Sequence, residues 1–291
     1  MHIETKTEKK PSHRKYIIAV GFILLLITSA LVFVLHTQES QSDPVSEKII
    51  REVAAAQLGK DPNELNDEDF AKIIDLRISS KELKDIKLLD KFTNLQTLDL
   101  TNCRAAKRIV PKLMTILEKI GLHDTSQLKY IDLRPLRNLR NLKSLTLLST
   151  DFNNIKPLAN LINLRELYLG SDQVEEIDSL RQLINLETLV ISATNVSNLE
   201  PIEGITNLRK LDIIFANVSS LEPIAKLTNL QELTLGGKSI QEIEPLKALN
   251  NLKVLVLFGC YNLKKEQIDS LQQALPNLKI QKIDLGKIKF P

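Results

Sequence analysis

Tryptophan is absent from the 291-residue chain and aromatic residues make up only 4% of it, so a folded core must be built from aliphatic side chains. The two cysteines, Cys103 and Cys260, are too far apart in sequence to indicate a disulfide framework or a metal site. The net charge of +3 is too small to indicate a nucleic-acid-binding surface. Hydrophobic residues at 43% and charged residues at 26% are still typical of a globular protein.

Sequence signatures of catalysis are also missing. There is no glycine-rich phosphate loop, no Gly-x-Ser-x-Gly motif and no pairing of cysteine with histidine. His2, His13 and His36 lie near an apolar N-terminal segment, His123 stands alone, and the acidic residues are spread along the chain. The sequence therefore predicts a protein that is not an enzyme, with no cofactor, no metal site and no small-molecule substrate.

The apolar N-terminal segment begins at Tyr16, ends at Leu35 and carries no charge over its 20 residues. A helix of this length spans about 30 Å, the thickness of a bilayer core. Residues 1–15 hold five Lys or Arg against two Glu, whereas residues 36–45 are polar and acidic. This bias predicts a cytoplasmic basic tail, a single transmembrane signal-anchor helix and a linker, with the rest of the chain periplasmic or extracellular.

Two other interpretations of this segment remain open. A cleaved signal peptide has a similar charge layout, but its apolar core is usually shorter and ends at a small-x-small site, which is missing here. The third interpretation is a helix buried in a soluble domain. The length of the run favours the anchor.

A period of 22 residues dominates the rest of the chain. Asn-Leu pairs end at Leu142, Leu164, Leu186, Leu208, Leu230 and Leu252, and each continues as L-x-x-[LI]-x-[LI]. Such a segment predicts a short strand with its leucines on one face. The second half of most units ends in x-Pro-[LI], and proline cannot extend a sheet because it has no amide hydrogen to donate. One unit cannot bury its own leucines, so the units must stack.

These motifs resemble the leucine-rich repeat superfamily, and in particular its bacterial internalin type. The resemblance covers roughly residues 71–285. It implies an α/β fold, a curved solenoid with a parallel β-sheet on the concave face and an irregular or 3-10 convex side. In the family an Asn or Cys after each strand hydrogen-bonds to neighbouring loops. Most of that ladder is missing here, since its positions are Cys103, Thr150, Asp172, Thr194, Ala216, Lys238 and Cys260.

The register breaks once, over residues 104–141. Leu95 and Leu142 are 47 residues apart, three more than two repeats. The favoured interpretation places an additional strand at residues 117–122, in a repeat with three extra residues. The rival places it at residues 128–133, which leaves only 14 residues to the next strand, too few for a repeat.

Helical caps are predicted at both ends, because terminal repeats expose apolar edges. An N-terminal cap over residues 46–70 contains one helix with Ser46 as its N-cap and a second with Asn66 as its N-cap. A C-terminal cap helix is expected over residues 264–274, and residues 286–291 form a tail.

The side chains between the inward leucines are predicted to form the binding surface, since such solenoids usually bind on the concave face. Apolar groups on an outward face suggest that a partner covers them. For Val256 and Phe258, packing under the C-terminal cap is the alternative. The candidate partner-binding residues are Tyr168, Val190, Asp212, Ile214, Phe215, Glu232, Val256 and Phe258.

The sequence thus predicts a membrane-anchored leucine-rich repeat protein that binds a protein partner non-covalently outside the cytoplasm, with no nucleic-acid partner. One alternative is a structural scaffold of the cell envelope. Another is a secreted, adhesin-like repeat protein, if the N-terminal segment is cleaved.

Overall fold

The computed structural model describes residues 42–103 and 130–284. The chain divides into two compact units, Met1–Ser42 and Asp43–Pro291, and the description below concerns the second. Within the described ranges, no helix has the length and apolar character needed to cross a bilayer. Residues 16–35, for which the anchor is predicted, lie outside these ranges.

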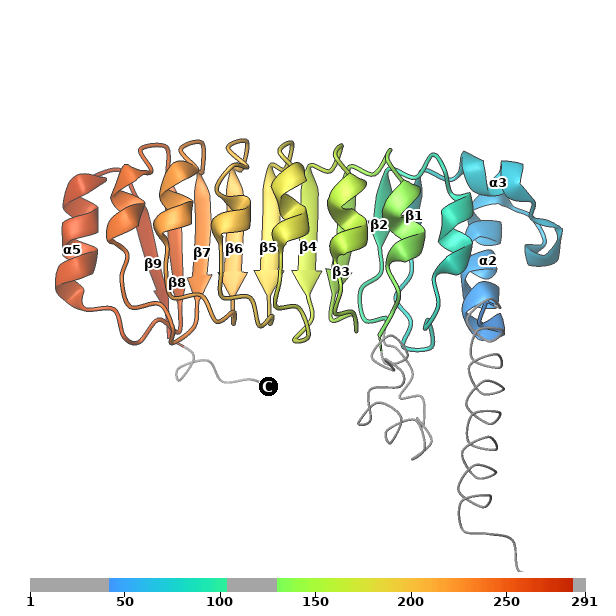
Figure 1. The fold of residues 1–291 in the computed structure, drawn as a ribbon, viewed down its shortest axis with the longest axis horizontal. Helices are drawn as coiled ribbons and strands as arrows, with labels where there is room; N and C mark the ends of the chain where they lie inside the picture. The colour runs from blue at the N-terminus through green and yellow to red at the C-terminus, as the bar shows by residue number, and fades with distance from the viewer. Residues whose placement is uncertain (1–41, 104–129, 285–291) are drawn as a thin grey trace, which may run out of the picture. The chain divides into compact units, whose positions relative to one another are not determined.

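Nine parallel strands form one sheet in strict chain order, as predicted (Figure 1). Each strand is short, with three to five residues, because the chain must leave the sheet and return within each repeat. The strands are β1 Asp75–Arg77, β2 Thr97–Asp99, β3 Ser144–Leu148, β4 Glu166–Gly170, β5 Thr188–Ser192, β6 Lys210–Ile214, β7 Glu232–Gly236, β8 Val254–Phe258 and β9 Lys279–Ile283.

The 22-residue period sets the register in which neighbouring strands pair. Leu167 of β4 pairs with Leu189 of β5, which pairs with Leu211 of β6. These leucines are fully buried, whereas the residues beside them in each strand are only partly buried. Each leucine therefore stacks on its equivalents in the next repeats, and the core runs continuously along the array.

The second half of each repeat forms a 3-10 helix on the other side of the core (Figure 1). Proline occupies one of the first two positions in most of them, where its fixed φ suits the turn and its missing N–H costs nothing. The predicted irregular or 3-10 side is thus confirmed. These helices are η2 Lys87–Lys91, η4 Arg134–Asn138, η5 Lys156–Asn160, η6 Asp178–Gln182, η7 Glu200–Ile202, η8 Glu222–Lys226 and η9 Glu244–Ala248.

The prediction of an additional strand between Leu95 and Leu142 is wrong. Leu98 of β2 pairs directly with Leu145 of β3, so the sheet has no further strand between them. Residues 117–122, where the favoured interpretation places that strand, lie outside the described ranges. The two paired leucines are 47 positions apart, 25 more than one period. The irregular segment 104–141 is therefore one repeat with an insertion between Cys103 and Tyr130, and residues 104–129 lie outside the described ranges.

The N-terminal cap begins with helix α2, Pro44–Leu58, and its N-cap is Asp43 rather than the predicted Ser46. Asp43 accepts a hydrogen bond from the Ser46 backbone N–H at 2.8 Å. The Ser46 hydroxyl instead accepts hydrogen bonds from the backbone N–H groups of Lys84 and Asp85, at 2.9 and 3.1 Å. Ser46 is buried because it joins the cap to the first repeat.

Helix α3, Asp67–Lys72, begins at the predicted N-cap Asn66 and has a complete capping box with Asp69. The Asp69 side chain is 1% exposed and lies 2.8 Å from Lys60 Nζ and 3.0 Å from Lys72 Nζ. Hydrogen bonds from these two lysines lower the pKa of Asp69 from 3.8 to about 2. The charged form of the Asp69 carboxylate is therefore stabilised by two lysines of the cap.

Stability of the cap is expected to depend on pH through Asp69. Since the folded pKa is depressed, the contribution is complete above pH 3.8 and is lost as pH falls through about 2. Asp69→Asn should therefore lower the unfolding temperature most at neutral pH, and its difference from the wild type should shrink toward pH 2. Thermal unfolding of both chains across this range measures the effect, and a difference independent of pH would contradict it.

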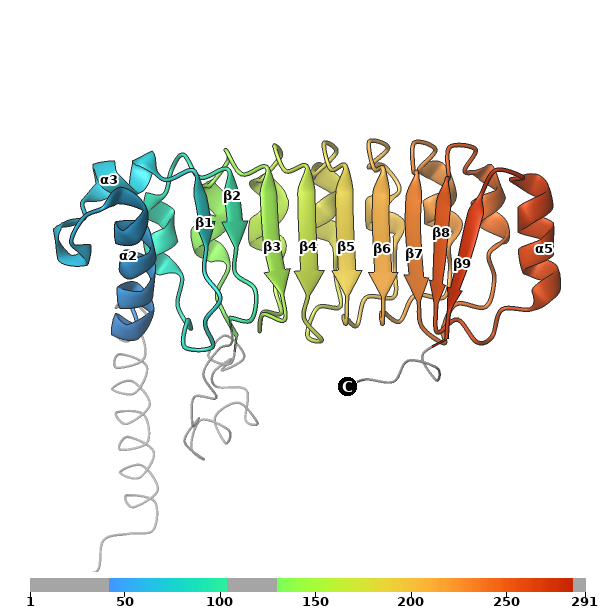
Figure 2. The ribbon, with the colours of Figure 1, turned by 180° about the vertical axis from the view of Figure 1, so that it is seen from behind.

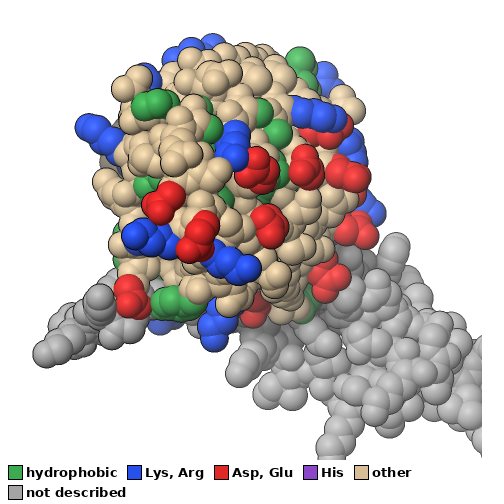
Figure 3. All heavy atoms as spheres, turned by 90° about the vertical axis from the view of Figure 1, so that its left-hand side faces the viewer, with side chains coloured by type: hydrophobic (Ala, Val, Ile, Leu, Met, Phe, Trp, Pro, Cys, Tyr) green, Lys and Arg blue, Asp and Glu red, His purple; other side chains and the backbone are tan. Residues whose placement is uncertain are grey.

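At the other end, helix α5, Lys265–Ala274, confirms the predicted C-terminal cap helix within one residue. It packs against η9, on the side of the 3-10 helices. When the array is viewed from this end, charged side chains are spread over the surface and hydrophobic ones are scattered (Figure 3). The helix therefore closes the core with a polar surface.

Candidate functional site

Figure 2 shows the side of the sheet that is turned away from the 3-10 helices, which we call the sheet face. The partly buried residues of β5, β6 and β8, which alternate with the buried core residues, belong to this face and include most of the candidate binding residues. Tyr168, Val190 and Asp212 occupy one position of successive strands and pair with one another in register. Ile214 and Phe258 occupy a second position, separated by Gly236 of the strand between them. The alternation of inward and outward residues along each strand therefore places these side chains on one surface.

Two aromatic rings meet on this face across an intervening strand. Phe215 follows β6 and Phe258 ends β8, yet their ring centroids are 5.6 Å apart with an edge-to-face angle of 76°. Strand β7 lies between them and ends in Gly236, followed by Gly237. Because neither glycine has a side chain, the rings can approach each other above β7. We call these two rings the aromatic pair.

Phe215 has an unusual backbone conformation, with φ of 57°. The equivalent residue of several other repeats also has positive φ, but there it is Asn102, Ser149, Ala193, Gly237 or Gly259. A bulky residue in this conformation costs about 1–2 kcal/mol. Its side chain is also 51% exposed, so burial does not explain its presence. A strained and exposed aromatic residue indicates a functional constraint.

Charged groups lie beside the candidate residues on the sheet face. Lys210 Nζ is 3.6 Å from Glu232 Oε2 and 3.9 Å from Asp212 Oδ2. The other carboxylate oxygen of Asp212, Oδ1, is buried and has no hydrogen-bond partner among the described residues. Burial, followed by the charge of Glu166, raises the pKa of Tyr168. The carboxylates of Asp212 and Glu232 therefore share one ammonium group on this face.

Val256 and Phe258 are not covered by the cap helix. They pair with Gln281 and Ile283 of β9, and α5 packs against η9 instead. Both residues are half-buried on the sheet face. The cap helix itself therefore does not cover them, whereas β9 of the C-terminal unit lies beside them.

A row of hydrogen-bonded asparagines lies where the strands begin. The sequence analysis did not identify these asparagines as a ladder. The asparagine of each x-Asn-Leu step donates a hydrogen bond from Nδ2 to a backbone carbonyl of the preceding repeat, over 2.8 to 3.0 Å. The repeated Asn-Leu pair was the signal in the sequence. This asparagine row consists of Asn94, Asn141, Asn163, Asn185, Asn207, Asn229 and Asn251.

Replacing one member of the asparagine row tests its structural role. Asn207→Ala removes the donor to the Ile184 carbonyl, which lies 2.9 Å away, and should lower the free energy of unfolding by about 1 kcal/mol. Asn217→Ala is the control, because its side chain bonds only to the exposed Asn195 side chain and should change stability by less than about 0.5 kcal/mol. Urea unfolding measures both, and equal effects would contradict the assignment.

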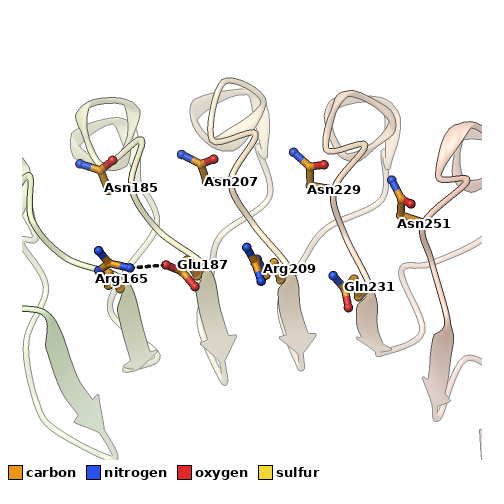
Figure 4. Close-up of a pocket in the computed structure, with 8 residues that line it drawn as sticks. All are labelled: Arg165, Asn185, Glu187, Asn207, Arg209, Asn229, Gln231 and Asn251. Carbon is orange, nitrogen blue, oxygen red and sulfur yellow. Dashed lines mark hydrogen bonds and ion pairs between the residues drawn. The ribbon is translucent and has the colours of Figure 1, made fainter.

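A groove runs along this edge beside the asparagine row (Figure 4). Its other wall is formed by the residues that immediately precede the strands. We call this set of residues the edge row. The groove has a volume of about 490 Å³, and a second groove of about 440 Å³ near β1 and β2 is lined by the same two rows. The larger groove is lined by Arg165, Asn185, Glu187, Asn207, Arg209, Asn229, Gln231 and Asn251.

The two cysteines have the structural role that their repeat position predicts. Cys103 Sγ donates to the Ile78 carbonyl and Cys260 Sγ to the Leu235 carbonyl, both at 3.4 Å. Thr150 donates similarly to Leu100, whereas the buried Thr194 hydroxyl has no partner among the described residues. Burial raises the pKa of both thiols, which disfavours the reactive thiolate. In the described ranges no three His, Cys, Asp or Glu side chains cluster as metal ligands would.

The fold is similar to that of several solved leucine-rich repeat proteins. An internalin from Listeria monocytogenes superposes with a TM-score of 0.65 at 24% identity, over 84% of this chain and 72% of that one. Internalin C2 of the same species gives 0.64 at 23%, over 84% and 98%. A leucine-rich repeat protein of Leptospira interrogans gives 0.58 at 20%, over 75% and 51%. The sequence matches no family model and no curated protein. These likenesses show a leucine-rich repeat fold.

Proposed function

We propose that this chain binds a protein partner through the sheet face, without catalysis. The observation that carries the proposal is the aromatic pair, in which Phe215 keeps a strained backbone and a half-exposed ring. Exposed aromatic side chains dominate the binding energy of protein interfaces, because they bury a large area and lose little conformational entropy. The pair is also held in place by its own ring contact before a partner arrives.

The charged groups of the sheet face favour a partner with a basic side chain beside apolar ones. Glu166, Asp212 and Glu232 supply three carboxylates near the centre of the face, against the single ammonium group of Lys210. A complementary charge of this kind gives specificity and a faster encounter.

Site-specific crosslinking tests the sheet face directly. A photo-crosslinking residue at Thr234, beside the aromatic pair on the sheet face, should capture the partner in living cells. The same residue at the exposed Gln182, in η6 on the opposite side, is the control and should not capture it. Identical products from both positions, or none from Thr234, would reject the proposal.

We also propose that the chain is anchored in a membrane with its repeats outside the cytoplasm. The support is the uncharged segment of residues 16–35 and the basic residues before it. A single cysteine at position 42, in a chain with Cys103→Ala and Cys260→Ala, should react with a membrane-impermeant thiol reagent on intact cells. Protection of that cysteine until the cells are lysed would contradict the orientation.

A further inference from the structure

The edge row carries an excess of positive charge, and Arg165, Glu187 and Arg209 are its charged members that line the larger groove. It contains four cations, Lys143, Arg165, Arg209 and Lys253, and one carboxylate, Glu187. Arg165 is neutralised by Glu187, with 2.7 Å between Nη1 and Oε1. Among the described residues, the ammonium groups of the two lysines donate to glutamine side chains and to no carboxylate.

Arg209 is the free cation at the middle of the larger groove. Its side chain has no hydrogen bond and no ion pair with any of the described residues, and Figure 4 shows it between Glu187 and Gln231. A guanidinium group presents several N–H donors in a plane that matches a carboxylate or a sulfate. The groove therefore presents a guanidinium group that an anionic group could bind.

The asparagine row faces the same groove with fixed amides. Because each Nδ2 already donates one hydrogen to the backbone, its orientation is set, and Oδ1 and a second N–H remain available. Neighbouring strands are about 4.8 Å apart, so the groove presents one asparagine amide at about this spacing. Fixed, regularly spaced acceptors and donors suit a polymer of polar, hydroxyl-bearing units.

We propose that this groove binds an anionic polysaccharide, with sugar hydroxyls on the asparagine row and a carboxylate or sulfate on Arg209. The eight residues that line the larger groove include no aromatic and no aliphatic side chain. A single-stranded nucleic acid would need aromatic side chains for its bases to stack on. An acidic peptide would need a cluster of arginines, whereas of the two arginines that line the larger groove Arg165 is already paired with Glu187. This site is separate from the sheet face and does not depend on the proposed protein binding.

The test measures binding of the purified full chain, in non-ionic detergent, to heparin as the anionic polysaccharide. We expect binding that weakens with salt, and no binding to neutral dextran. Arg209→Gln should weaken heparin binding about tenfold, because it removes a charge-assisted contact. Arg181→Gln in η6 is the matched control, since it makes the same change in charge on the opposite side and should leave binding unchanged.

Three results would overturn the proposal. One is the absence of heparin binding, and another is an equal loss in the two arginine variants. The third is binding of poly-glutamate or of a single-stranded oligonucleotide as tight as that of heparin, because the groove would then recognise charge alone or a different polymer.

Discussion

Replacing Leu211 by alanine is expected to lower the free energy of unfolding by about 3 kcal/mol. Leu211 is 0% exposed, in strand β6 inside the array, and it stacks between Leu189 and Leu233 of the neighbouring repeats. Its truncation leaves a cavity that a close-packed core fills only in part. Since each repeat is stabilised mainly by its neighbours, the loss affects both interfaces of the repeat. Chemical denaturation of the purified chain measures the change.

Ile214→Ala in the same strand is the matched control. Ile214 is also aliphatic, but it lies on the sheet face and is only partly buried. Its truncation should cost less than about 1.5 kcal/mol, because less apolar surface leaves the protein interior. If the two variants were equally unstable, the assignment of one core face and one binding face to β6 would be wrong.

The repeat architecture could be predicted from the sequence because its physical cause is local and repeated. A leucine every second position in a strand, and a proline where the chain turns away, each occur in register many times. This regularity predicted the inward leucines and the stacking of the repeats, and the resemblance to leucine-rich repeats added the parallel sheet and the 3-10 side. The cap helix that begins after Asn66 followed in the same way from a capping motif.

The features that the sequence did not reveal depend on contacts between repeats. The insertion after Cys103 was assigned to an extra strand because residue counting cannot show that β2 pairs with β3. Ser46 was chosen as N-cap because Asp43 and Ser46 are both good capping residues, and only the contact of Ser46 with Lys84 and Asp85 separates them. The aromatic pair joins residues that are 43 positions apart, and the free space above two glycines permits it.

Phe215→Gly is expected to weaken partner binding about 30-fold while leaving stability nearly unchanged. Loss of an aromatic anchor at the centre of an interface typically costs about 2 kcal/mol of binding free energy or more. In the free chain, glycine relieves the positive φ of 57°, a gain of about 1 kcal/mol. That gain offsets the lost ring contact, which contributes about 0.5–1.5 kcal/mol. Binding of the partner captured at Thr234, together with urea unfolding, measures both quantities.

Phe258→Ala separates the role of the ring from the role of the backbone. Phe258 ends a regular strand, so its replacement relieves no positive φ and should weaken binding with a small loss of stability. Ala193→Gly is the control for the backbone, because Ala193 has φ of 50° at the equivalent position of another repeat and carries no ring. It should leave binding unchanged. If Phe215→Gly bound the partner as well as the wild type, the strained phenylalanine would have no role in recognition, and the sheet face would lose the observation that marks it as the binding site.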